Sequence, residues 1–249
     1  MLLNAKVLLD QAWEIYKKSF WIFFGIIILP MLASTALTYS ISASTSLLLL
    51  KSPSLNSLGL EMLILSGALT LAVIVIQVWG QTALLCAIKD RKENIGLKES
   101  YRRGWDKIIS YFWVSFLSGI IISVGLFFFL VPGLIFLVWF GLASFVFISE
   151  NKKGWSALMT SKNYARGNWR GVFWRFLFIG TIAYLFLHLF NTLEVFTPIP
   201  AIREIYFYFG YALMSPMATI YLFLIYENLK KIKNDDFVHQ DYQKSERKK

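Results

Sequence analysis

The chain has 249 residues, of which 57% are hydrophobic and 16% are charged, and its formal net charge is +10. Because a soluble globular domain has about 25% charged residues, this composition excludes an ordinary water-soluble protein and indicates a membrane protein. The single cysteine, Cys86, excludes an internal disulfide and a thiolate metal cluster, and we expect it to be a small apolar residue of a helix.

Residues 2–18 predict an amphipathic helix in front of the first membrane span. Their charged side chains recur every three or four positions and so share one helical face: Lys6, Asp10, Glu14 and Lys17. The opposite face carries Leu8, Ala12 and Ile15. Such a helix lies either in the cytoplasmic interface of the membrane or under the bundle as a plug.

Runs without charged residues predict six spans, since one spanning helix needs about 20 apolar residues. The longest run, Ile108–Ser149, is about twice that length, and Pro132 and Gly133 near its middle predict the turn between two spans. The expected spans cover about residues 20–39, 60–88, 110–130, 134–149, 172–190 and 205–227.

These spans define one helical membrane domain, residues 1–228, followed by a tail, residues 229–249. Between the first two spans, we expect Ser40–Leu58 to form the largest outer loop, because serine, asparagine and proline interrupt the apolar pattern there. The tail is rich in charged residues, so we expect it to be exposed and either frayed or disordered.

The basic residues are distributed unevenly across the expected spans. If the N-terminus is cytoplasmic, 23 of the 25 lysine and arginine residues lie on the cytoplasmic side, and only Lys51 and Arg203 lie outside. The positive-inside rule therefore predicts a multi-pass protein of the cell membrane with both termini in the cytoplasm. We expect the basic segments to contact the anionic head groups of the lipid bilayer, and this pattern argues against nucleic-acid binding.

Three groups of polar side chains recur at helical spacing inside the expected spans. They are Gln77 and Gln81, then Thr181, Tyr184 and His188, and then Tyr208, Tyr211 and Ser215. Amides in hydrocarbon are costly unless they are hydrogen-bonded, so these faces should point into the bundle. They either line a polar pathway or only join neighbouring helices, and the second role is favoured. Near the outer end of its span, His188 is expected to be an interfacial histidine rather than a proton relay.

Three short segments read alike, and each stands before a span. In each one a tyrosine is followed by a basic residue, a small residue and a tryptophan: Tyr16–Trp21, Tyr101–Trp105 and Tyr164–Trp169. Each segment closes an amphipathic cytoplasmic helix, which we call an elbow helix, and precedes two spans. The sequence thus predicts an all-α polytopic membrane bundle of six transmembrane helices, divided into three units of elbow helix plus hairpin.

The central hairpin and the segment after it resemble a known family. The residues concerned are Val131–Ile135, Glu150, Gly154–Leu158, Ser161 and Ala165–Trp169. They are similar to uncharacterised prokaryotic membrane proteins related to the membrane domain of glycerophosphoryl diester phosphodiesterase. The resemblance covers about half of the chain and implies a multi-helix membrane module. Some members carry a phosphodiesterase barrel, which is not expected here because only about twenty residues follow the last span.

Residue types that catalyse hydrolysis or bind metals are not grouped in this sequence. All fifteen acidic residues lie outside the span interiors, and neither His188 nor His239 belongs to a metal-spaced cluster. We therefore expect no catalytic residue, no metal and no cofactor. The expected function is that of a non-catalytic scaffold, assembly or regulatory component of the cell envelope, with a membrane-protein partner or a second copy of the chain. The alternative is a carrier or pore for a neutral or lipid-like solute.

Overall fold

A computed structural model describes residues 2–51, 55–93, 95–192 and 200–246, which are helical almost throughout. In chain order the helices are α1 (Ala5–Lys18), α2 (Phe20–Lys51), α3 (Leu55–Lys89), the 3-10 helix η1 (Arg91–Glu93), α4 (Leu97–Trp105), α5 (Ile108–Phe128), α6 (Leu130–Phe140), α7 (Ala143–Glu150), α8 (Gly154–Ala165), α9 (Trp169–Thr192) and α10 (Pro200–Glu246). Within these described residues, six segments are long and apolar enough to cross a membrane: Phe20–Ser40, Ile64–Lys89, Ile108–Phe128, Leu130–Glu150, Trp169–Thr192 and Tyr206–Asp235. The predicted all-α, multi-pass membrane bundle is confirmed.

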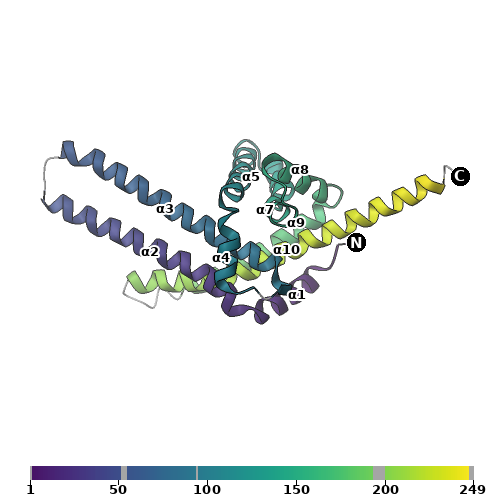
Figure 1. Cartoon of the computed structure of the whole chain (residues 1–249), viewed down its shortest axis with the longest axis horizontal. Coiled ribbons are helices and arrows are strands. Elements are labelled where there is room, and N and C mark those ends of the chain that lie inside the picture. Colours follow the sequence, from purple (N-terminus) through teal and green to yellow (C-terminus); the bar gives the residue numbers. More distant parts are fainter. Residues whose placement is uncertain (1, 52–54, 94, 193–199, 247–249) are drawn as a thin grey trace.

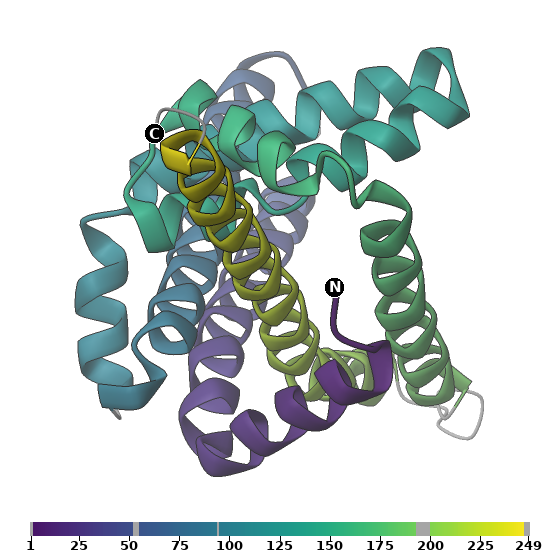
Figure 2. The ribbon, with the colours of Figure 1, turned by 90° about the vertical axis from the view of Figure 1, so that its right-hand side faces the viewer.

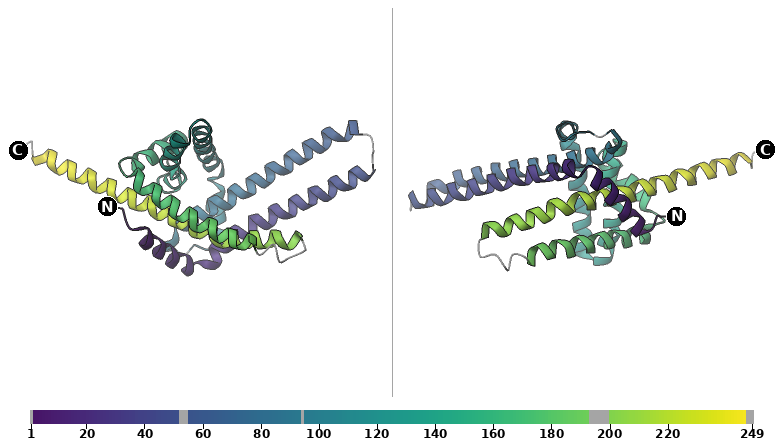
Figure 3. Two further views of the ribbon diagram at one scale, coloured as in Figure 1. Left: turned by 180° about the vertical axis from the view of Figure 1, so that it is seen from behind. Right: turned by 90° about the horizontal axis from the view of Figure 1, so that it is seen from below.

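The chain repeats a short helix followed by a helical hairpin. α1 precedes α2 and α3, α4 precedes α5 and α6, and α8 precedes α9 and α10. The α2–α3 hairpin and the α9–α10 hairpin project from the body of the molecule in the same direction, to the left in Figure 1 (Figures 1 and 3). The α5–α6 hairpin lies across them, since it is seen along its axis in Figure 1 and from the side in Figure 2. The middle unit therefore differs from the other two in the direction of its hairpin.

The buried core lies where α2, α3 and α10 meet α1, α7 and α8. We call this region, together with α4, the basic end, because the lysine and arginine residues of the short helices and their connections lie there (Figure 1). Every side chain of α3 from Thr82 to Ile88 is buried, whereas Leu71 and Val75, further along the same helix, are 63% and 45% exposed. Apolar side chains exposed on a membrane helix face lipid. Protein packing therefore holds the basic end together, and lipid covers the projecting hairpins.

α1 packs under the bundle. Asn4 caps its start by accepting a hydrogen bond from the Lys6 amide at 3.3 Å. Leu8 and Ala12 are fully buried, as their helical spacing predicts, and α1 lies against α10. One face of α1 therefore packs on the bundle, while the charged face with Lys6, Asp10 and Glu14 is exposed.

The outer loop predicted over Ser40–Leu58 is wrong for the residues that the structure describes. Residues 40–51 continue α2, and residues 55–58 open α3. The hydroxyls of Ser40, Ser42 and Ser46 each donate to the carbonyl oxygen one turn earlier, at 2.8–3.1 Å. Because the helix itself satisfies these hydroxyls, a serine-rich composition does not end it.

Most of the predicted disordered tail is also helical. α10 runs without a break from Pro200 to Glu246 and includes Pro216. Lysine, glutamate and glutamine are good helix formers, so a charged composition is compatible with continuation of a helix that is already nucleated in the membrane. The last residues of the predicted tail, 247–249, lie outside the described residues.

The α5–α6 hairpin reverses at Phe129 rather than at Pro132 and Gly133. Phe129 has extended backbone angles (φ −152°, ψ 125°) between the two helices, and Pro132 lies in the first turn of α6, where its missing amide is not needed. A Cβ on Gly133 would lie 2.6 Å from the Cα of Leu126. This glycine therefore permits close packing of the two helices, and the predicted turn lies a few residues too late.

Gly104 sets the distance between α4 and α3. A Cβ at this position would lie 2.9 Å from the amide nitrogen of Ala83 and 3.1 Å from its Cα, so Gly104→Ala should force α4 away from α3. We expect the free energy of unfolding to fall by about 1–3 kcal/mol relative to the control below, measured by denaturant or thermal unfolding in detergent.

The control is Gly119→Ala on α5, because a Cβ there meets no atom within 4 Å. Both substitutions gain the same helix propensity, so the difference between them isolates the steric effect. Equal stability of the two variants would show that α4 and α3 are not in close contact.

Candidate functional site

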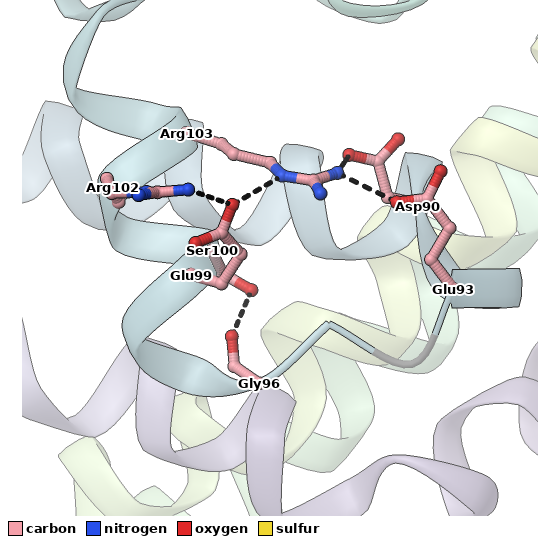
Figure 4. Close-up of polar contacts among 7 residues, drawn as sticks. All are labelled: Asp90, Glu93, Gly96, Glu99, Ser100, Arg102 and Arg103. Carbon is pink, nitrogen blue, oxygen red and sulfur yellow. Dashed lines mark hydrogen bonds and ion pairs between the residues drawn. The ribbon is translucent and has the colours of Figure 1, made fainter.

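The first polar cluster surrounds Arg103 of α4 (Figure 4). Its guanidinium binds three carboxylates, those of Asp90 at 2.5 Å, Glu93 at 3.0 Å and Glu99 at 2.9 Å. Arg102 also pairs with Glu99, at 3.0 Å. Asp90 and Glu93 belong to the connection between α3 and α4, so these ion pairs fold the connection back onto α4.

The charges of this cluster stabilise one another. Hydrogen bonds from Arg103 and Arg102 hold the pKa of the Glu99 carboxyl below its ordinary value. Hydrogen bonds to Glu99, Asp90 and Glu93 in turn raise the pKa of Arg103. Both groups therefore remain charged at neutral pH, and their ion pairs are present there.

Aromatic side chains fix the other side of α4. Nε1 of Trp79 in α3 donates to the backbone carbonyl oxygen of Tyr101 at 2.8 Å, and the Tyr101 hydroxyl donates to the carbonyl oxygen of Ile26 in α2 at 2.7 Å. Trp105 packs edge-on against Trp79, with ring centroids 5.0 Å apart. Burial raises the pKa of Tyr101 to about 12, so this hydroxyl stays a donor at neutral pH. The second elbow motif thus anchors α4 to both helices of the first hairpin.

The second polar cluster surrounds Glu150 at the end of α7. Its Oε1 accepts hydrogen bonds from the hydroxyls of Tyr164 in α8, at 2.7 Å, and Tyr226 in α10, at 2.8 Å. Lys152 and Lys230 form ion pairs with the carboxylate at 3.0 and 3.2 Å. Burial and the bond to Glu150 raise the pKa of Tyr164, so its hydroxyl remains a donor. Only 11% of the Glu150 side chain is exposed, and this one carboxylate joins three helices.

Neighbouring residues of α10 bind two further segments. Nη2 of Arg91 in η1 lies 2.9 and 3.2 Å from the two carboxylate oxygens of Glu227. Oδ1 of Asn228 accepts a hydrogen bond from the Leu3 amide at 3.2 Å, and Arg175 of α9 donates to the Leu3 carbonyl oxygen at 2.9 Å. α10 thus connects the first unit to the third and holds the N-terminal segment between itself and α9.

We call the Arg103 cluster, the Glu150 cluster and the α10 contacts of Glu227 and Asn228 the polar network. Each carboxylate in it is bound to a cation or a hydroxyl of the protein, so the network holds helices together. Within the described part of the chain, no three His, Cys, Asp or Glu side chains lie close enough to hold a metal ion. Comparison of the chain with protein-family models, with curated proteins and with solved structures gave no match.

Glu150, Arg103 and Glu227 are not among the site residues predicted from the sequence. One signal existed for Glu150, because it is the only acidic residue between Asp106 and Glu194 and directly follows an apolar run. No local pattern could have paired Glu227 with Arg91, since the two are 136 positions apart.

The predicted polar faces of α3 and α9 have different surroundings. The Gln77 amide donates to the Ser34 hydroxyl of α2 at 2.9 Å, which is a helix-joining bond, and Gln81 is half-buried one turn further on. On α9, Tyr184 is 65% exposed and lies beside His188, with ring centroids 5.8 Å apart. Thr181 and His188 are exposed as well, so this face points outward instead of into the bundle.

The predicted polar face of α10 is half-buried. Tyr208 and Tyr211 pack against the hydrophobic core, and the carbonyl oxygen of Ser215 accepts a hydrogen bond from the Thr219 hydroxyl at 2.8 Å. The structure therefore joins Gln77 to α2 and places Tyr208 and Tyr211 against the core, while the α9 face lies on the surface. These side chains do not converge on one shared site.

Glu150→Ala tests the second cluster. The substitution removes the acceptor of two hydroxyls and the ion-pair partner of two lysines, so we expect the free energy of unfolding to fall by about 2–4 kcal/mol. Glu14→Ala on the exposed face of α1 is the control, and it should change stability by less than about 0.5 kcal/mol. Equal effects in a denaturant titration would contradict the structural role of Glu150.

Acidification tests the first cluster. Since the pKa of Glu99 is lower in the folded protein than in the unfolded chain, its ion pairs contribute stability that is fully present above the unfolded value of roughly 4.3 and is lost as the pH falls through the folded pKa. We expect the Tm to fall on acidification below about pH 5, and to fall less steeply in Glu99→Gln. Parallel Tm curves for the two proteins would refute this assignment.

Proposed function

We propose that this protein is a non-catalytic scaffold or assembly component of the cell envelope, which presents a rigid basic surface to a membrane-protein partner. The observation that carries this proposal is the polar network. Its charged side chains bind other groups of the protein and so join helices. In an active site, such side chains would instead face a substrate. A surface held by many ion pairs is preorganised, and preorganisation favours binding of a partner.

The shape of α10 supports a role in assembly. This helix has 47 residues and a length of about 70 Å, and it continues beyond the polar network to the right of Figure 1. A helix that extends beyond its own bundle can pack against another helix or bind in a groove of a partner. The partner we propose is another membrane protein or a second copy of this chain.

The proposed orientation places the basic end in the cytoplasm and both termini with it. Of the 25 lysine and arginine residues, 23 belong to segments on that side. The protein would then be a multi-pass component of the cell membrane whose basic segments face anionic lipid. The resemblance of residues 131–169 to the module related to the membrane domain of glycerophosphoryl diester phosphodiesterase agrees with such a non-catalytic role, since no activity is attached to the shared motifs.

A carrier for a lipid-like solute is the alternative. The observation that favours it is an almost wholly apolar cavity of about 710 Å³ between α2, α3 and α4. A cavity of this size matches those that bind small molecules. The bond between Gln77 and Ser34 speaks against a polar pathway along α3, because that amide is already used between helices.

Photo-crosslinking in intact cells tests the scaffold. A photoreactive residue replaces the exposed Lys92 or Lys231 at the basic end, and Trp21, which is 79% exposed on the apolar surface, serves as the matched control position. We expect an adduct of one defined mass from the basic positions and none from Trp21. Truncation after Asp235 should remove the adduct from Lys231 while the thermal stability of the bundle is retained.

The two functions give different results. Lack of any discrete adduct at the basic end, together with lipid movement across vesicles that contain the purified protein, would reject the scaffold and support the carrier. A discrete adduct without such movement supports the scaffold.

A further inference from the structure

We propose that the cavity between α2, α3 and α4 binds an acidic phospholipid from the leaflet next to the basic end, with an acyl chain inside and the phosphate on Lys98 and Arg102. The cavity has a volume of about 710 Å³, and its walls include Leu29, Pro30 and Ala33 of α2, Ile76 and Trp79 of α3, and Tyr101 of α4. This inference goes beyond the proposed function, since a scaffold and a carrier can both hold such a lipid.

The walls select a hydrocarbon chain. Their two polar side chains are turned to other partners: the Trp79 indole donates to the Tyr101 carbonyl oxygen, and the Tyr101 hydroxyl donates to the Ile26 carbonyl oxygen. The cavity is therefore lined by ring faces and aliphatic carbons. A polar solute would lose its hydrogen bonds to water on entering, whereas an acyl chain loses none.

The rim selects an anion. Lys98 and Arg102 line the cavity from α4 and are one helical turn apart, so they share a face. Both are exposed, and Lys98 forms no ion pair within the described residues. Arg102 pairs with Glu99, but that carboxylate is shared with Arg103, and 77% of the Arg102 side chain remains exposed. Arg103 also binds Asp90 and Glu93, which keeps those two carboxylates away from an incoming phosphate.

The position of the cavity favours a membrane lipid over a solute from water. Leu29 and Leu32, which are 47% and 60% exposed, lie on the outer surface of the same α2 segment that walls the cavity. This surface faces the bilayer, so a lipid can enter sideways with its head group at the level of α4. An amphiphile with an anionic head and an apolar tail matches both the walls and the rim.

Close helix packing forms the cavity in advance. A Cβ on Gly80 would lie 2.6 Å from Cγ of Pro30, so the glycine lets α3 approach α2 at this level. Together with the close approach of Gly104 to Ala83, this contact holds all three walls. A preformed cavity does not have to be opened by its ligand.

The first elbow motif forms a second cavity of the same kind. This cavity has a volume of about 490 Å³ and is lined by Trp13, Tyr16 and Lys17 together with apolar residues of α9 and α10. In both cavities the tyrosine of the elbow motif and the basic residue after it, Tyr16 with Lys17 and Tyr101 with Arg102, belong to the lining. The same two residues of the elbow motif thus line a cavity in two of the three units.

The test measures lipids that remain bound to the full-length protein by native mass spectrometry, after purification in detergent and addition of phosphatidylglycerol or phosphatidylcholine. We expect retention of phosphatidylglycerol over phosphatidylcholine. Loss of two phosphate contacts in the double variant K98A/R102A should lower phosphatidylglycerol binding about tenfold. Equal retention of the two lipids by the unmodified protein would overturn the proposal.

The matched control is R166A/R170A, which removes two exposed charges with the same spacing from residues that line neither cavity. An equal loss of phosphatidylglycerol in both double variants would overturn the site, because it would indicate general attraction to a basic surface. Ala33→Phe fills the cavity and should abolish the bound lipid, with Ala33→Leu as the milder replacement if the first variant unfolds. Full lipid retention in a folded Ala33 variant would equally refute the proposal.

Discussion

A carboxylate at the end of an apolar helix is costly unless it is paired, and the arrangement of the basic end depends on how Glu150 is paired. Two hydroxyls and two ammonium groups satisfy it, and they come from α8, from α10 and from the connection after α7. Because Tyr226 and Lys230 are fixed on this carboxylate, the residues between them are positioned as well. Glu227 then meets Arg91, and Asn228 meets the N-terminal segment. One charge thus sets the register of the longest helix against three other parts of the chain.

Features that follow from local spacing could be predicted from the sequence. The runs without charge predict the six apolar helical segments, and the positions of Leu8 and Ala12 predict the buried face of α1. The long-range contacts of the polar network could not be predicted in this way, because residues such as Arg91 and Glu227 are 136 positions apart in the chain. Polarity alone also misplaced the α9 face with Tyr184, since a side chain with both a ring and a hydroxyl is stable at an exposed position near a helix end.

Helix ends were harder to predict than helices. Serine and proline read as signals for loops and turns, but α2 satisfies its own serine hydroxyls, and Pro132 fits the first turn of α6. The direction of the α5–α6 hairpin is likewise beyond local patterns. α5, α6 and α7 all pack against α8, and a turn at Gly141 and Leu142 separates α6 from α7. The spacing of apolar residues predicts where a helix lies in the sequence. The direction of the helix depends on the helices that it packs against.

The length of α10 has a mechanical consequence. A helix that is unbroken from Pro200 to Glu246 is a stiff rod, and the polar network grips it near residues 226–230, away from either end. Buried side chains from Ala212 to Leu229 hold the same helix over the preceding turns as well. Packing in the middle of the rod therefore sets the direction of both of its ends, and a change in that packing would move the two ends together.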